Sequence, residues 1–164
     1  MVKIVKIKLH SEIKSKLRKL QIDNLDKVKK NKHFSVGALI KSKNKYLIIN
    51  RNLYPAGYAG IAGHVMKNEY SLKALHREVK EETGLDITKS KLLFHEIIKG
   101  NECRTGFHLH EWKLYKCECK GKVKLCKREV KSIKYLTKEQ INKLYKERKL
   151  EPVWEHWFKK LFNY

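Results

Sequence analysis

Three glutamates within five residues, placed in a helical pattern, constrain this chain more than any other feature of its sequence. Glu78, Glu81 and Glu82 stand at positions i, i+3 and i+4. On a helix their side chains leave one face, with Cβ atoms about 5–6 Å apart. The apolar residues that recur at spacings of three and four are Leu72, Leu75 and Val79. The segment is therefore predicted to be an amphipathic helix that packs on a core and presents three carboxylates on another face.

The sequence around this helix supplies its boundaries. Ser71 can cap the start, and Gly84 can adopt the left-handed conformation that ends a helix. Upstream, three glycines fall within seven residues, at 57, 60 and 63. This spacing predicts a loop whose backbone can approach a ligand closely.

Strand-like and helix-like patterns occupy the rest of the chain. FSVGALI and YLIIN flank the turn-like KSKNK, which predicts a β-hairpin over residues 33–50. HEWKLYKCEC and KVKLC predict a second hairpin around Lys120-Gly121-Lys122. Helices are expected over Glu139–Lys149 and Val153–Phe162, and the aromatic side of the last helix is expected to be buried against the domain or a second subunit.

Length and charge narrow the class of protein. The 164 residues suit a single domain, in which residues 1–32 form an extension with a strand over 1–9 and a short helix from Ser11. The 39 basic and 17 acidic residues give a net charge of +22, which makes polyanions the first partners to consider. Six of the basic residues are Arg and the rest Lys, so a general lysine bias competes with a designed nucleic-acid surface.

Compartment is indicated by what the sequence contains. No apolar run approaches the roughly 18 residues that span a bilayer, and residues 1–9 alternate Lys with apolar residues rather than forming a secretory signal. Four Cys residues suit a reducing environment. A soluble, cytoplasmic protein with no membrane partner is expected.

The three carboxylates on one helix face indicate a binding site for a cation. Like charges at these spacings are destabilising by a few tenths of a kcal/mol per pair, and Arg77 is the one helical neighbour of opposite sign. A hard divalent ion such as Mg²⁺, which takes oxygen ligands and bridges carboxylates to phosphates, would supply the charge. An ordinary solvated acidic face is the alternative, and it is less attractive in so basic a chain.

The segment Gly63–Leu85, GHVMKNEYSLKALHREVKEETGL, resembles the Nudix box. The pattern is a Gly, five residues, a Glu, seven residues, and then Arg-Glu-U-X-Glu-Glu-X-Gly-U, where U is aliphatic. Every fixed position is matched, by Gly63, Glu69, Arg77, Glu78, Val79, Glu81, Glu82, Gly84 and Leu85. The chain is identified on this motif as resembling the Nudix hydrolases.

The resemblance extends over residues 34–145, because the strands before the box and REVKSIKYLTKEQI after it are similar to the family's pattern. It implies an α/β fold, an α/β/α sandwich with a mixed β-sheet and a loop-helix-loop Nudix motif. Residues 1–32 and the aromatic C-terminal helix at 152–164 lie outside what the family pattern explains.

Residue roles follow from the resemblance. The metal ligands would be Glu78, Glu81, Glu82 and the backbone carbonyl of Ala62. The structural residues of the box would be Gly63, Glu69, Arg77 and Gly84, with Glu69 and Arg77 as a pair that ties the loop to the helix. Arg51 matches a position that often meets substrate, against a solvated strand-end Arg as the alternative. Glu129 is the candidate general base, with Glu82 as the other candidate.

The implied reaction is Mg²⁺-dependent hydrolysis of the pyrophosphate bond of a nucleoside diphosphate linked to another group, with Mn²⁺ as an alternative metal. A small nucleotide is favoured as substrate. The rival reading is an RNA 5′-end pyrophosphohydrolase, or a basic RNA-binding protein that uses the Nudix fold; a homodimer is compatible with either. No residue pattern that distinguishes Nudix subfamilies is present, and Ala62 stands where related isopentenyl diphosphate isomerases carry a catalytic Cys.

Two further groups were weighed as sites. A zinc cluster of Cys103, Cys117, Cys119 and Cys126 departs from paired CxxC spacing, so ordinary strand thiols are favoured. His108 and His110 share a strand face, and packing or surface exposure is expected of them rather than ligation.

Overall fold

The computed structural model describes residues 32–100, 102–103 and 106–164. The strand and helix expected within residues 1–31 lie outside the described residues. The described elements are β1 (His33–Ser42), β2 (Lys45–Arg51), β3 (Gly57–Ala59), β4 (Ile61–His64), α2 (Ser71–Thr83), β5 (Asp86–Lys99), β6 (Leu109–Lys120), β7 (Val130–Leu136), α3 (Lys138–Lys146) and α4 (Pro152–Phe162).

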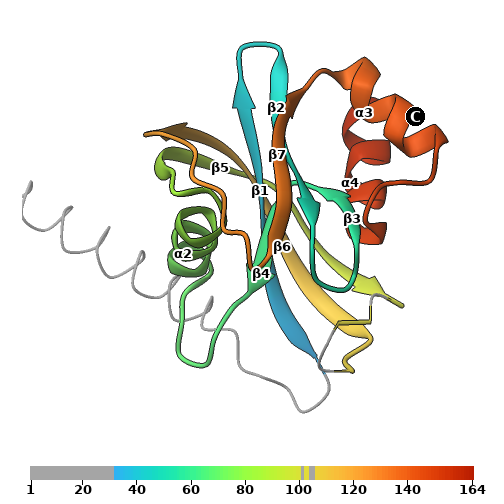
Figure 1. Ribbon diagram of the computed structural model, residues 1–164. Coiled ribbons are helices and arrows are strands. Elements are labelled where there is room, and N and C mark those ends of the chain that lie inside the picture. The colour runs from blue at the N-terminus through green and yellow to red at the C-terminus, as the bar shows by residue number, and fades with distance from the viewer. Residues whose placement is uncertain (1–31, 101, 104–105) are drawn as a thin grey trace, which may run out of the picture.

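A mixed sheet of seven strands forms the centre of the molecule, in the order β3-β2-β1-β6-β5, with β4 paired to β1 and β7 paired to β2. β1 runs parallel to β6 and antiparallel to β2 and β4. Helix α2 lies on one side of the sheet, and α3 and α4 lie on the other (Figure 1). The expected sandwich with a mixed sheet is confirmed.

The first hairpin forms as predicted. Lys41 pairs with Tyr46 and Ser42 with Lys45, and Lys43 turns the chain at a φ of 52°. Residues 34–40 of β1 are all buried, as expected for a central strand covered on both faces.

The prediction of a second hairpin is wrong. β6 pairs with β5 and β1, whereas residues 122–126 form no strand. After Gly121, at a φ of 108°, the backbone N–H of Lys124 donates to the carbonyl of Thr83 at 2.7 Å. The chain therefore turns onto the end of α2 and leaves Val123 and Leu125 exposed.

The long strand β5 was not predicted. Its pairing with β6 shifts register between Ile87 and Lys89 and again between Leu92 and Phe94. Two irregularities break the alternation of apolar and polar residues, so no single two-residue period runs through the segment.

The glycine-rich segment and the helix after it differ from expectation in detail. The predicted loop contains two short strands, β3 and β4. Tyr70, not Ser71, is the N-cap of α2, and Leu72 is exposed, so the inward stripe is made by Ala74, Leu75 and Val79. Gly84 closes the helix as predicted, at a φ of 72°, with its N–H bonded to the carbonyl of Lys80.

The aromatic C-terminal helix is part of the core. Trp154, Trp157 and Phe158 of α4 are each at most 1% exposed, which confirms the expectation that this stripe is buried. The carboxylate of Glu151 caps the helix by accepting from the N–H of Trp154 at 2.9 Å.

Helix α3 ends at Lys146 and is therefore shorter than predicted. None of the helices in the described part of the chain is long and apolar enough to cross a membrane.

Gly60 should resist substitution because of this buried helix. A methyl group on Gly60 would lie 2.3 Å from Cη2 of Trp154, in a ring that is 1% exposed. Gly60→Ala is expected to lower the free energy of unfolding by about 1–3 kcal/mol in urea denaturation. In a Trp154→Phe background, which lacks the approached indole atoms, the cost should shrink. An equal cost in both backgrounds would contradict this origin.

Candidate active site

Helix α2 and strand β4 meet at Gly63. A Cβ atom on Gly63 would lie 1.9 Å from the Cδ atom of Glu78. The absence of a side chain on the strand therefore lets the carboxylate of the helix lie directly against the backbone. The sequence predicted that this segment approaches a ligand closely, whereas the group that lies against Gly63 is the side chain of Glu78.

Arg77 joins the loop before the helix to the carboxylates on it. Its Nε donates to Oε1 of Glu69 at 2.9 Å, and its Nη2 donates to Oε2 of Glu69 at 2.9 Å. The other contacts of the guanidinium are to Glu78 Oε1 at 2.6 Å, Glu81 Oε2 at 3.4 Å and the carbonyl oxygen of His64 at 2.9 Å. The predicted pair of Glu69 and Arg77 is present, and the hydrogen bond from Arg77 holds the pKa of Glu69 below its usual range.

Glu82 is the least satisfied carboxylate of the group. It is 4% exposed, and its Oε2 atom has no hydrogen-bond partner among the described residues. Its pKa is raised to about 8, mainly by burial and to a smaller extent by the neighbouring charges of Glu78 and Glu129. Arg51 and a hydrogen bond from the Ala62 backbone act in the opposite direction, and they do not compensate for burial.

Glu78 is a second carboxylate whose pKa is affected by burial. Burial raises its pKa, with Glu81 and Glu129 adding to the effect and Arg77 opposing it. Glu81 is more exposed and lies at the rim of the group. Glu129 is held by Nε and Nη2 of Arg128 at 3.0 and 2.5 Å. The predicted glutamates therefore converge from α2 and from the start of β7.

This arrangement fits a bound divalent cation. A buried carboxylate oxygen without a donor, beside two further carboxylates, lacks positive charge. Oxygen ligands of this kind are the ones that Mg²⁺ and Mn²⁺ accept. Glu78, Glu81, Glu82 and the carbonyl of Ala62 are the groups that could hold such an ion.

A cavity of about 250 Å³ reaches strand β4 at Ala62 and Gly63, and none of the carboxylates on α2 lines it. Arg51, Ala62 and Gly63 line it together with Trp112 and Glu151. The Nε of Arg51 donates to the carbonyl of Pro55 at 2.9 Å, which fixes the guanidinium at the cavity. A cation at the end of a concave site is suited to an anionic ligand.

The sequence interpretation missed a second group of side chains at this cavity. His64, Cys103 and His110 line it, and His33 lies next to them. The pKa of His64 is lowered to about 4 by burial and by the charges of His33, His110 and Arg51. His110 was expected to serve packing or the surface, and only the register of β1, β4 and β6 brings these residues together.

The other cysteines behave as strand thiols. Burial raises the pKa of Cys117 to about 12 and that of Cys119 to about 11, which keeps both thiols protonated. The group of potential metal ligands that contains Cys103 includes neither of them, nor Cys126, within the described residues.

Comparison with known proteins places this geometry in context. The family model described as NUDIX domain matches residues 31–158. The MutT protein from Methanosarcina mazei Go1 is similar in structure, with 20% identity, a TM-score of 0.66, and coverage of 84% of this chain and 97% of that chain. The NUDIX hydrolase from Nitrosomonas europaea has 19% identity, a TM-score of 0.63, and coverage of 76% and 84%. The MutT NUDIX hydrolase from Burkholderia pseudomallei has 20% identity, a TM-score of 0.59, and coverage of 66% and 85%.

These identities support similarity of fold alone. No curated protein matches the chain.

Glu82 should make the stability of the metal-free protein depend on pH. Its pKa is about 8 in the folded protein and 4.5 without the shift, so the folded state holds the proton more tightly. Its contribution to stability is therefore complete below pH 4.5 and is lost as the pH rises to about 8. Glu82→Gln cannot ionise and should lack this loss.

Thermal unfolding in EDTA checks this expectation. Across that pH interval the free energy of unfolding of the variant should increase relative to that of the wild type by on the order of 1 kcal/mol or more, since one pKa unit is worth about 1.4 kcal/mol. Stability curves that stay parallel for the two proteins would contradict the shift assigned to Glu82.

Proposed function

The chain belongs to the Nudix hydrolase family, and we propose that it hydrolyses the pyrophosphate bond of a small nucleoside diphosphate derivative with the help of a divalent cation. The observation that carries the proposal is the buried carboxylate oxygen of Glu82 that lacks a donor, beside Glu78 and Glu129 and next to a cavity that contains Arg51. Converging carboxylates and a nearby guanidinium suit a metal-bound phosphate.

The ion would be held by Glu78, Glu81, Glu82 and the carbonyl of Ala62, with Mg²⁺ preferred and Mn²⁺ as an alternative. When bound, it supplies neutralisation of phosphate oxygens and activation of water. Arg77 orients Glu78 and Glu81 from one side while it is itself fixed by Glu69. These contacts set the positions of the ligands before any ion arrives.

Glu129 is the proposed general base. Arg128 fixes its carboxylate through two hydrogen bonds to Oε1. Glu129 acts electrostatically on both Glu78 and Glu82, which supports a role for it as the acceptor of a proton from water near these carboxylates. Glu82 is the other candidate base, but it serves better as a ligand because its buried carboxyl has a raised pKa without a cation.

Arg51 is proposed to bind substrate phosphate. Its guanidinium lines the cavity, and it also faces the charges of Glu82, Glu151 and His64. A cavity of about 250 Å³ lies near the lower end of the range for small-molecule sites, roughly 300 Å³. These features favour a small nucleotide as substrate.

The net charge of +22 favours a second candidate, the 5′ end of an RNA. The same carboxylates would serve that reaction, and lysines outside the cavity would contact the chain. Six such contacts with single-stranded RNA would give a log–log salt slope of roughly −4, whereas a small nucleotide would respond less. Comparing ADP-ribose with a 5′-triphosphorylated RNA at two salt concentrations separates the two candidates.

Glu82→Gln is expected to lower turnover of the best pyrophosphate substrate by on the order of 100-fold or more, because it removes the negative charge and keeps the shape. Excess EDTA should abolish turnover by the wild type. Glu118→Gln, a change of an exposed side chain on β6, serves as the matched control and should keep the parental rate. A folded Glu82→Gln variant with full activity would exclude Glu82 from the site.

Gly63→Ala should separate activity from stability. All three of the nearest atoms to the added methyl belong to the flexible end of Glu78, so the carboxylate should move while the backbone stays. A displacement of about 1 Å can cost on the order of 100-fold in rate. We expect such a loss in steady-state assays with a melting temperature close to the parental value.

The double variant provides the control for this expectation. If Gly63→Ala acts through Glu78, adding it to Glu78→Gln should cause little further loss of rate. Independent, multiplying losses would show that the methyl group disturbs something else.

A further inference from the structure

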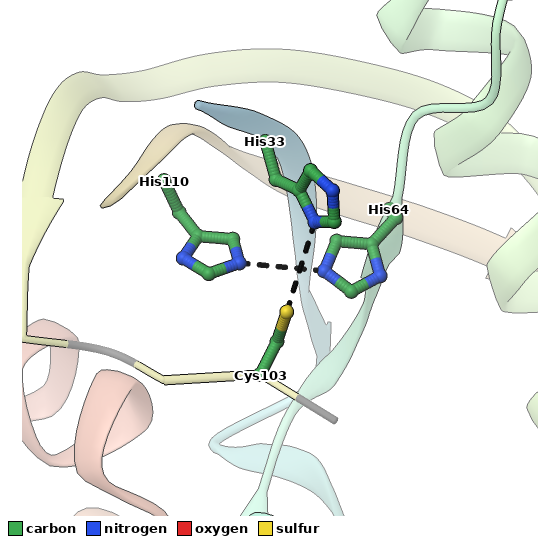
Figure 2. Close-up of side chains that lie close together, drawn as sticks. All are labelled: His33, His64, Cys103 and His110. Atoms are coloured by element: carbon green, nitrogen blue, oxygen red, sulfur yellow. Dashed lines mark hydrogen bonds between the residues drawn. The ribbon is translucent and has the colours of Figure 1, made fainter. Parts of the chain in front are cut away.

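Four side chains at the edge of the cavity point toward one another: His33, His64, Cys103 and His110 (Figure 2). Each offers one ligand atom, and these four atoms all lie within 4.8 Å of one another. We propose that they form a tetrahedral site for a transition-metal ion, with Zn²⁺ as the matching ion, separate from the carboxylate site on α2.

Two of the spacings between ligand atoms agree with the edge lengths of a coordination tetrahedron. Nε2 of His64 and Nε2 of His110 are 3.4 Å apart, and Sγ of Cys103 and Nδ1 of His33 are 3.7 Å apart. Zinc–nitrogen bonds of about 2.0–2.1 Å and a zinc–sulfur bond of about 2.3 Å place two nitrogens about 3.3 Å apart and a nitrogen and sulfur about 3.6 Å apart. The lines that join the two pairs cross in Figure 2, as opposite edges of a tetrahedron do in projection.

Hydrogen bonding alone explains these contacts poorly. Good nitrogen hydrogen bonds have donor–acceptor distances of about 2.7–3.2 Å, and the contact between His64 and His110 is longer. Neutral imidazoles whose nitrogens converge with a thiol are the form of these groups that binds metal.

The fold holds the ligands rigidly on three adjacent strands. His33 on β1 and His110 on β6 are direct partners in the parallel ladder, and His64 on β4 pairs with Ser35, two residues along from His33. His33 is also stacked on Phe107, with ring centroids 3.7 Å apart. Three of the four ligands therefore keep their positions without a metal.

Cys103 is the fourth ligand and comes from the connection between β5 and β6. It is 8% exposed, its N–H donates to the carbonyl of Phe107 at 3.1 Å, and its carbonyl accepts from Gly106 at 2.8 Å. Metal binding through Cys103 would attach this connection to the sheet beside the cavity. A site with four protein ligands has no open position, so its role is to position the cavity wall and not to activate water.

The donor atoms distinguish this site from the carboxylate group. Three imidazoles and a thiolate suit Zn²⁺, whereas the oxygen ligands on α2 suit Mg²⁺. The sites are adjacent, because the carbonyl of His64 accepts from Nη2 of Arg77 at 2.9 Å. An ion at His64 would therefore also help to fix the strand that carries Ala62 and Gly63.

Cobalt substitution tests the proposal on the full chain. The reduced, metal-free protein is titrated with Co²⁺ in excess Mg²⁺, which fills the oxygen site. We expect one equivalent to give a thiolate-to-cobalt charge-transfer band together with the intense visible bands of tetrahedral Co²⁺, and Zn²⁺ to abolish both. Cobalt on carboxylates gives no thiolate band.

Matched variants assign the ligands. Cys103→Ser should lose the thiolate band, whereas Cys126→Ser should keep it. His64→Gln, at the most exposed ligand, should weaken Co²⁺ affinity by at least 10-fold, in line with the loss of a ligand or its support, whereas His108→Gln should not.

Two outcomes would overturn the proposal. One is a wild-type chain that shows no thiolate band at stoichiometric Co²⁺. The other is a Cys103→Ser variant that keeps an unchanged spectrum. The spectrum does not depend on turnover, so the result stands whatever the substrate of the enzyme is.

Discussion

The bidentate contact between Arg77 and Glu69 is the interaction on which the site depends. It fixes the loop between β4 and α2 to the helix, since Glu69 also accepts from the N–H of Met66 at 3.0 Å. The same guanidinium reaches Glu78 and the carbonyl of His64, so one cation orients a helix, a loop and a strand. Arg77 is committed to these contacts, and Glu82 keeps an Oε2 atom without a hydrogen-bond partner among the described residues, while the charge of Arg51 offsets its burial only in part.

The burial of the Glu82 carboxylate has a structural reason. Glu82 is buried by the packing of α2 on the sheet, and the close approach of the two is permitted by Gly63. The free-energy cost of burying an unpaired carboxylate is high, and it is acceptable where a ligand supplies the missing charge. The packing of the helix therefore agrees with the proposed metal site, in which an ion would offset the burial that raises the pKa of Glu82.

The sequence predicted the parts of the fold that local rules determine. The hairpin of β1 and β2, the helix closed by Gly84 and the buried aromatic face of α4 all follow from periodicity and turn chemistry. The carboxylates were found from their spacing on one helix, and the pair of Glu69 and Arg77 was implied by the resemblance of this segment to the Nudix box. Strand β5 was missed because its bulges break the alternation, and the hairpin after β6 was wrong because its second arm bonds to the end of α2 instead.

Local sequence rules do not predict the cluster of His33, His64, Cys103 and His110. No two of these residues are closer than seven in sequence, and their meeting depends on β1 lying between β4 and β6 with one particular register. A shift of one residue in either ladder would send a histidine to the other face of the sheet. The information is present in the hydrophobic pattern that sets the register, but it becomes visible only when the strands are paired. Nitrogen and sulfur ligands beside the cavity and oxygen ligands on α2 would let one chain distinguish two metals by ligand chemistry alone.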